Sequence, residues 1–284
     1  MAPGREAGTE PKSDPGTEPR ADCTVDADGR TTFVLQPQSA VRPQLLLRLR
    51  PKKGQPETVL HTLDLEPMGD GRLRAVLEPR PALVEGRWDV YLLSEPGAAR
   101  QRLRPGLRDL RALVDGHARD RSSPVAVRIP YATKDSFLAV RAWLRTAHAE
   151  VDGIDVTDRS MTVRARLHGA SLGEGAAVRL SPRGEDGAVR TVGLRAETGS
   201  PGFSFTVDYE ELVAGGGTGT RVWDLFVQLP PAADAPRIRI GRLLDDVADR
   251  KEIFVYPTAT VDGVAVEPYY TVDNDLSLKA TRAG

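Results

Sequence analysis

The residues best suited to chemistry lie in one stretch of the 284-residue chain, PYYTVDNDLSLKA at positions 268–280. Two adjacent tyrosines there precede an Asp-Asn-Asp run, residues 273–275. Carboxylate and amide oxygens are the ligands that hard divalent cations prefer, so Asp273 and Asp275 could hold a metal and, through it, a nucleotide sugar. The same residue types are typical of a turn between two strands. The stretch therefore allows two interpretations.

A segment similar to this stretch occurs in the first half of the chain. Residues 130–142, PYATKDSFLAVRA, match it at Pro, Tyr, Thr, Asp, Leu and Ala, with an offset of 138 (268 minus 130). Asp135 is the counterpart of Asp273, which favours a turn at both positions. Phe137 is the counterpart of Asp275, so the two halves would not share a metal site.

The tyrosines provide further candidates. Tyr269 and Tyr270 are adjacent on an expected strand, so their side chains should point to opposite faces. Because Tyr131 matches Tyr269, we expect Tyr269 to be structural and Tyr270 to be exposed. The candidate ligand or partner contacts are the residues specific to the second half: Tyr256, Tyr270, Asn274 and Asp275.

Two other groups of titratable residues are weaker candidates. The acidic run DDVAD, residues 245–249, would place carboxylates on one face of a helix, which we interpret as a solvated face. The four histidines lack the spacing typical of a metal site; they are His61, His117, His148 and His168. We therefore predict no catalytic residue, no metal ligand and no cofactor.

Composition narrows the function classes. The chain has 39 Lys and Arg against 40 Asp and Glu, a net charge of -1, which argues against nucleic acid as a partner. Cys23 is the only cysteine, so no disulfide forms within the chain. No stretch approaches the roughly 18 apolar residues of a membrane span. Residues 1–22 are rich in Pro, Gly, Glu and Thr, and we expect a disordered tail and a cytoplasmic protein.

Internal repeats extend beyond the matching segments at residues 130–142 and 268–280. Three further pairs of segments match in the same order: LRLRP (47–51) with VRLSP (178–182), RWDVYLL (87–93) with VWDLFVQ (222–228), and RLRPG (102–106) with RIRIG (237–241). We interpret the chain as a tandem duplication with copies at residues 23–148 and 149–284.

Each copy is predicted to be β. Apolar residues alternate with polar ones, as in residues 45–49, and Gly-containing turn motifs separate the runs. About seven short strands per copy indicate an antiparallel sandwich of immunoglobulin type, with Trp88 and Trp223 in mid-core positions. One short helical crossover is expected per copy, at 107–116 and 242–252. The fold class is thus all-β, two tandem immunoglobulin-like sandwiches after a disordered tail.

The ordered signature WDV or WDL, then RLRPG or RIRIG, then PYYTVDNDLSL resembles the β-sandwich modules that accompany actinobacterial glycosyltransferases of cell-wall polymer type. The resemblance covers both copies, from about residue 23 onward. It implies a scaffold, because in such proteins a separate nucleotide-sugar-binding domain of alternating β and α units carries out the transfer. No such pattern occurs in this sequence, and no catalytic residue carries over.

The sequence therefore predicts a non-catalytic accessory or interaction module, whose partner is a protein, such as a glycosyltransferase, or a glycan. One alternative is a glycosyl-transfer enzyme that holds a metal with the acidic run at 273–275. The other is direct carbohydrate binding through Tyr256 and Tyr270. Neither the oligomeric state nor the partner's identity follows from the sequence.

Overall fold

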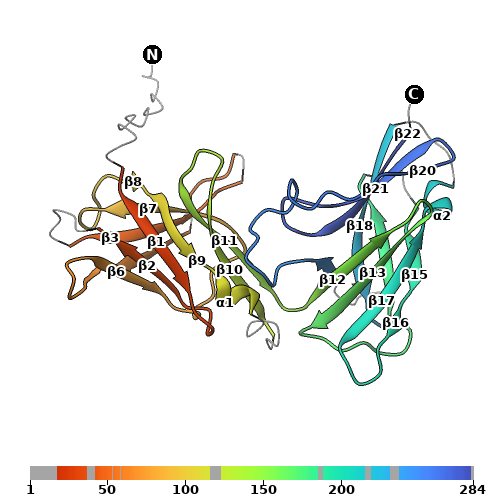
Figure 1. Ribbon diagram of the computed structural model, residues 1–284, viewed down its shortest axis with the longest axis horizontal. Helices are drawn as coiled ribbons and strands as arrows, with labels where there is room; N and C mark the ends of the chain where they lie inside the picture. The colour runs from red at the N-terminus through yellow and green to blue at the C-terminus, as the bar shows by residue number, and fades with distance from the viewer. Residues whose placement is uncertain are drawn as a thin grey trace, which may run out of the picture.

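The computed structural model describes residues 18–36, 42–52, 54–57, 59–115, 123–184, 188–214, 219–230 and 237–282. Over this part of the chain the regular structure is almost entirely β, with two short helices, α1 (Arg111–Val114) and α2 (Tyr209–Val213). The prediction of an all-β chain is confirmed. The strands form two units that lie side by side (Figure 1). Neither of the described helices has the length and apolar character that a membrane span requires.

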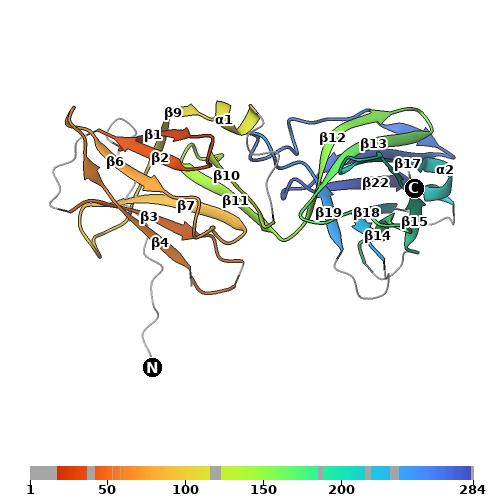
Figure 2. The same ribbon diagram turned by 90° about the horizontal axis from the view of Figure 1, so that it is seen from below.

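Two sheets make up the first unit. The first sheet has, in spatial order, β5 (Glu66–Pro67), β6 (Leu73–Leu77), β2 (Thr31–Leu35), β1 (Arg20–Val25) and β9 (Arg104–Asp109). The second has β10 (Val125–Ala132), β11 (Leu138–Arg145), β7 (Gly86–Leu93), β3 (Gln44–Leu49) and β4 (Leu60–Asp64), with β8 (Gln101–Arg102) paired to β7. Strands β1, β2 and β6 lie in one layer and β3, β4 and β7 in the other (Figure 2).

The core of the first unit lies between these two sheets. Along β3 and β7 every second side chain points inward, as the sequence alternation predicts: Leu45, Leu47 and Trp88 are at most 1% exposed. Phe33 and Leu35 of β2 meet them from the other sheet. Burial of each such side chain stabilises the fold by about 1.5–3 kcal/mol.

The second unit repeats this order of strands with two differences. Its strands form a path of β16 (Arg195–Ala196), β17 (Gly202–Asp208), β13 (Ser160–His168), β12 (His148–Val156), β19 (Ile238–Gly241), β18 (Gly219–Gln228), β22 (Leu276–Arg282), β21 (Val264–Tyr270) and β20 (Ala259–Val261). Strand β14 (Ala177–Pro182) pairs with β18 on one side and with β15 (Arg190–Gly193) on the other. One difference is that β20 is added at the edge beside β21. Because β19 pairs with both β12 and β18, it joins the two sheets. In the first unit two separate strands, β8 and β9, make the corresponding pairings with β7 and β1.

The repeated WD pairs explain how the sequence builds equivalent positions in both units. In each pair the tryptophan points into the core and the aspartate to the outer face. Asp89 accepts a hydrogen bond from Nη2 of Arg50 at 2.7 Å, and Asp224 accepts one from Nη2 of Arg183 at 2.6 Å. Each arginine follows the strand next to the WD strand, so each ion pair ties the end of that strand to the centre of the sheet. The two units thus make matching contacts at the two WD positions, whereas the tandem duplication and the immunoglobulin-like assignment stay predictions.

The strand directions and the start of the first strand differ from the expectation. The sheets are not purely antiparallel, because β1 pairs with β9 and β12 with β19 in parallel. The parallel pairs arise because, in each unit, the chain returns from the second sheet and then runs beside the unit's first strand, β1 or β12, in the same direction. Strand β1 begins at Arg20, within the predicted tail of residues 1–22, and residues 1–17 lie outside the described part of the chain.

The predicted helix at 242–252 is wrong. These residues form bends and turns, in which side chains from other segments bond the backbone. The first N–H groups of a helix have no partner within it, so among the bonds below only the one at Arg250 replaces a bond of the predicted helix. The Glu150 carboxylate accepts from the N–H groups of Leu243 at 2.7 Å and Leu244 at 3.0 Å. Asn274 Oδ1 accepts from the N–H of Arg250 at 3.1 Å. In the first unit, α1 does lie within the predicted range 107–116.

Gly241 provides a test of how closely the end of β19 approaches the β21–β22 turn. A Cβ atom there would lie 2.5 Å from the carbonyl oxygen of Asn274 and 3.1 Å from Cα of Asp275. Gly241→Ala is expected to lower the free energy of unfolding by about 1–3 kcal/mol, measured by urea denaturation. The control is Gly193→Ala in β15, where nothing lies within 4 Å; it should change stability by at most about 0.5 kcal/mol. Equal losses in the two variants would contradict the close approach.

Candidate functional site

The acidic stretch forms the turn of the hairpin β21–β22. The N–H of Thr271 donates to the carbonyl oxygen of Asp275 at 2.8 Å. Thr271 Oγ1 accepts from the N–H groups of Asp273 and Asp275, each at 3.2 Å. Asn274 adopts a φ of 59°, a left-handed conformation that Asn tolerates better than most residues. The segment is therefore a turn closed by a threonine side chain.

The first unit has the same turn at its β10–β11 hairpin. Thr133 donates its N–H to the carbonyl oxygen of Phe137 at 2.8 Å, and its Oγ1 accepts from the Phe137 N–H at 3.1 Å. Ser136, the counterpart of Asn274, has a φ of 60°. The turn interpretation drawn from the repeat thus agrees with the backbone of both hairpins.

The exposure predicted for Tyr270 is wrong. Its side chain is 0% exposed, and burial raises its pKa. The ring packs among Phe254, whose centroid is 5.9 Å away, and Tyr256, at 6.2 Å, with the Arg250 guanidinium over its face. Along β21 the inward residues are the even-numbered ones, so Tyr269 points to the outer face and is half-buried. The prediction placed Tyr269 in the core and Tyr270 outside, so it was shifted by one residue and assigned each tyrosine to the wrong face.

Tyr256 is the one predicted aromatic contact that keeps part of its side chain accessible. It is half-buried and packs its ring against the core of the second unit. A sugar contact through Tyr256 stays a prediction.

Asn274 is fully buried, and its side chain pins the loop at 242–252. Its Oδ1 accepts from the Arg250 N–H at 3.1 Å, and its Nδ2 donates to the Val247 carbonyl oxygen at 3.0 Å. Its own carbonyl oxygen accepts from the N–H of Arg242 at 3.0 Å. All of these contacts are structural.

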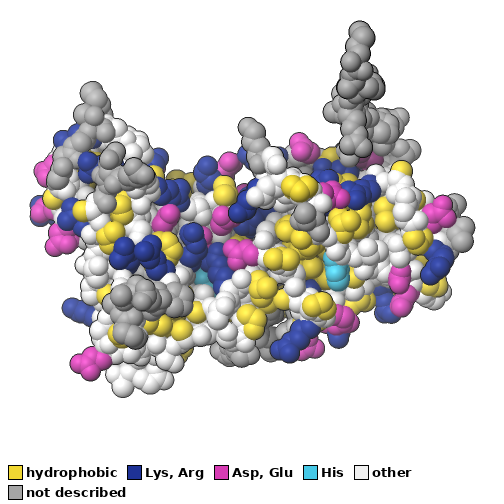
Figure 3. Space-filling model, turned by 180° about the vertical axis from the view of Figure 1, so that it is seen from behind, with side chains coloured by type: hydrophobic (Ala, Val, Ile, Leu, Met, Phe, Trp, Pro, Cys, Tyr) yellow, Lys and Arg dark blue, Asp and Glu magenta, His cyan; other side chains and the backbone are white. Residues whose placement is uncertain are grey.

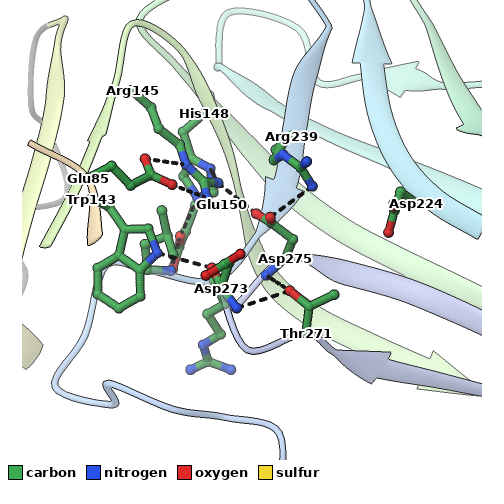
Figure 4. Close-up of polar contacts among 12 residues, drawn as sticks. Glu85, Trp143, Arg145, His148, Glu150, Asp224, Arg239, Thr271, Asp273 and Asp275 are labelled. Carbon is green, nitrogen blue, oxygen red and sulfur yellow. Dashed lines mark hydrogen bonds and ion pairs between the residues drawn. The ribbon is translucent and has the colours of Figure 1, made fainter. Parts of the chain in front are cut away.

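Asp275 is buried at the junction of the two units, 4% exposed. One carboxylate oxygen accepts from Nη1 of Arg145, on β11 of the first unit, at 2.8 Å, and the other accepts from Nη1 of Arg239, on β19, at 2.9 Å (Figure 4). Burial raises the pKa of Asp275, although the charges of Arg145 and Arg239 act in the opposite direction. The carboxylate is therefore fully engaged by two cations, one from each unit.

Arg145 extends this contact into what we call the junction cluster: Glu85, Arg145, His148, Glu150, Arg239 and Asp275. Arg145 Nη2 lies 3.3 Å from Glu85 Oε1, and Nη1 lies 3.3 Å from His148 Nδ1. An arginine can only donate, so His148 Nδ1 accepts and Nε2 donates to Glu150 Oε2 at 2.9 Å. Glu150 also accepts from the backbone of the loop after β19, so the cluster is a chain of satisfied hydrogen bonds from one unit to the other.

A second contact crosses the junction beside this cluster. Asp273 forms an ion pair with the buried Arg141. As Figure 4 shows, the Asp273 carbonyl oxygen accepts from Nε1 of Trp143, at 3.0 Å. Both Arg141 and Trp143 lie on β11. The outer residues of β10 and β11 also form an apolar cluster with Leu243 and Leu244 of the second unit.

The metal interpretation of the acidic run finds its carboxylates already in use. Asp273 pairs with Arg141, and Asp275 pairs with Arg145 and Arg239. The run at 245–249 is not a uniformly solvated face, because Asp245 is 7% exposed and pairs with Arg250. Among the described residues, no group of three or more His, Cys, Asp and Glu side chains is placed to hold a metal ion; His117 lies outside those residues.

Sequence reasoning missed the charged segment at the boundary of the two copies. Arg145, His148 and Glu150 occur in RTAHAE, residues 145–150, which carried no recognisable motif. One signal was available. Arg104 of RLRPG is repeated as Arg239 of RIRIG, whereas the turn residue Phe137 is replaced by Asp275, which offers a carboxylate to a retained cation.

Comparison with known proteins adds no family. No family model matches the sequence, and no curated protein matches it. A crystal structure of S. aureus TarS aligns with a TM-score of 0.28 and 16% identity, covering 66% of this chain and 35% of that one. A structure of S. aureus TarS residues 217–571 aligns with a TM-score of 0.29 and 14% identity, covering 78% of this chain and 62% of that one. This chain thus spans less than two thirds of either, and TM-scores this low establish no shared fold.

Asp275→Asn tests the junction cluster. The substitution leaves Arg145 buried beside a neutral partner, so we expect a loss of about 3–5 kcal/mol in the free energy of unfolding, measured by urea denaturation. The matched control is Asp155→Asn, which breaks an exposed ion pair with Arg164 and should cost at most about 1 kcal/mol. A loss no larger than that of the control would show that Asp275 does not stabilise the fold.

Proposed function

We propose that the chain is a non-catalytic interaction module, a two-unit β scaffold that presents its outer surfaces to a partner. The partner is a protein or a glycan, and the sequence resemblance favours an association with a glycosyltransferase of cell-wall polymer type. The observation that carries the proposal is the junction itself. The segment richest in potential metal ligands is engaged in holding the two units together.

A fixed relative orientation suits a binding scaffold. Ordering two units in advance lowers the conformational entropy lost when a partner contacts both. The junction supplies such order through Asp275, Asp273 and the apolar cluster around Leu243. We infer that each unit of this scaffold is an immunoglobulin-like sandwich and that the two units are tandem copies.

The rival function is glycosyl transfer with a metal at the acidic run. It would require Asp273 and Asp275 to exchange arginine partners for a cation. Titration calorimetry with manganese and a panel of nucleotide sugars separates the two functions. On our proposal the full chain gives no saturable heat.

The informative variant in that titration is Asp273→Asn, because the Asp273 side chain is 54% exposed whereas Asp275 is buried. Saturable binding of manganese that Asp273→Asn abolishes, with the far-ultraviolet circular dichroism unchanged, would contradict the proposal. Asp155→Asn serves again as the control for a lost surface carboxylate.

A distance measurement tests the fixed orientation. Cysteines at Asp64 on β4 and Glu211 on α2, both exposed, would carry spin labels, while Cys23 is buried at 1% exposure and should not react. We expect one narrow distance distribution in the parent chain and a broader one in Asp275→Asn. A distribution that is broad in the parent chain would show that the units move independently and would remove the basis for a rigid scaffold.

A further inference from the structure

Four arginines gather on the outer face of β3, β7 and β8 in the first unit. We call this surface the arginine face: Arg48, Arg50, Arg100 and Arg102, with the carboxylates of Glu57 and Asp89. Charged side chains of both signs are interspersed over the face of the molecule drawn in Figure 3. The arginine face departs from that balance, since four cations surround two anions.

Asp89 is the buried centre of the face, 2% exposed. Arg50 donates to it through Nε at 3.0 Å and Nη2 at 2.7 Å. Nη2 of Arg48 lies 3.1 Å from Asp89 Oδ2, and Nη2 of Arg102 lies 3.4 Å from Asp89 Oδ1. Burial opposes the ionisation of Asp89, but the hydrogen bonds and charges of these arginines lower its pKa overall. One negative charge therefore organises three positive ones.

Glu57 occupies the outer part of the face, 29% exposed along its side chain. Arg100 donates to its two oxygens through Nη1 at 3.0 Å and Nη2 at 2.7 Å, and Arg48 Nη1 lies at 3.3 Å. This two-pronged geometry is the one in which guanidinium groups recognise carboxylates most strongly. Glu57 thus shows, within the chain, how an accessible carboxylate sits on this surface.

The arginines remain accessible although they are well ordered. Their side chains are 21% to 37% exposed. Arg48 and Arg102 lie over the ring of Tyr91, at 5.3 and 5.8 Å from its centroid, and Arg102 and Arg104 lie over Phe137, each at 4.2 Å. Because arginines already cover these rings, the surface is suited to recognising anionic groups rather than to stacking on sugar rings.

A groove continues from the arginine face to the junction. It has a volume of about 530 Å³ and is lined by Arg50, Lys52, Arg87, Arg141, Glu85 and Asp273 among others. That volume is in the range of ligand-binding clefts. The groove adds Lys52, an exposed cation with no ion pair among the described residues, to the charge of the face.

We propose that the arginine face and this groove bind an acidic segment of a partner protein through its Asp and Glu carboxylates. The inference rests on the proposed scaffold function and names the class of its partner. The four guanidinium groups share two carboxylates, which leaves the face with an excess of two positive charges (4 minus 2) in a chain whose net charge is -1. Charge complementarity of this kind steers an acidic partner and fixes its register.

The test uses the full chain and fluorescein-labelled poly-L-glutamate, with fluorescence anisotropy at low ionic strength. Arg100→Gln with Lys52→Gln removes two accessible cations and should weaken binding by about tenfold. Arg159→Gln, a 74% exposed arginine of the second unit that also pairs with a glutamate, is the matched control and should leave the affinity unchanged. Equal weakening by the control, or none by the double variant, would overturn the inference.

Glu57→Gln gives a second readout that a purely structural role would not move. It removes the internal carboxylate that competes for Arg48 and Arg100, so binding of poly-L-glutamate should become several-fold tighter. Weaker binding in Glu57→Gln would overturn the inference. So would binding of polyphosphate or heparin in the absence of poly-L-glutamate binding, since the occupant would then not be a polypeptide carboxylate. None of these outcomes bears on the junction, so a failure here is distinct from a failure of the scaffold proposal.

Discussion

The buried ion pairs of Asp275 are the interaction on which the arrangement of this chain depends. A carboxylate removed from water is costly unless cations and hydrogen bonds surround it. Here one cation comes from each unit, so neither unit alone can satisfy the group. The geometry of the junction is thus specified by electrostatic need as well as by apolar packing, and the histidine and glutamate beside it continue the same bonding into the loop after β19.

The two units use one matching position in two ways. In the first unit Phe137 lies under Arg102 and Arg104 and takes part in cation–π contacts within its own unit. In the second, Asp275 occupies the matching place and binds Arg239 together with Arg145 of the other unit. A single exchange of aromatic ring for carboxylate converts a local contact into a connection between units.

Much of the fold could be predicted from local patterns. Period-two alternation identified the β character, and the repeated segments located equivalent strands and turns, because both signals are encoded in neighbouring residues. The candidate site could be predicted only in part. The register that buries Tyr270 continues the alternation of Val264 and Val266, whereas the backbone bonds of the segment 242–252 come from the side chains of Glu150 and Asn274, which lie far away in the sequence. Local propensity carries no record of such partners.

The junction also has a consequence for the order of folding. The hydrogen bond between Arg145 and Asp275 joins residues 130 positions apart. During synthesis the first unit emerges well before the hairpin β21–β22. At that stage the surface of β11 carries Arg141, Trp143 and Arg145 without the groups that later cover them. The newly made first unit therefore passes through a stage with an open, partly apolar and cationic face, which closes only when the last hairpin of the second unit reaches it.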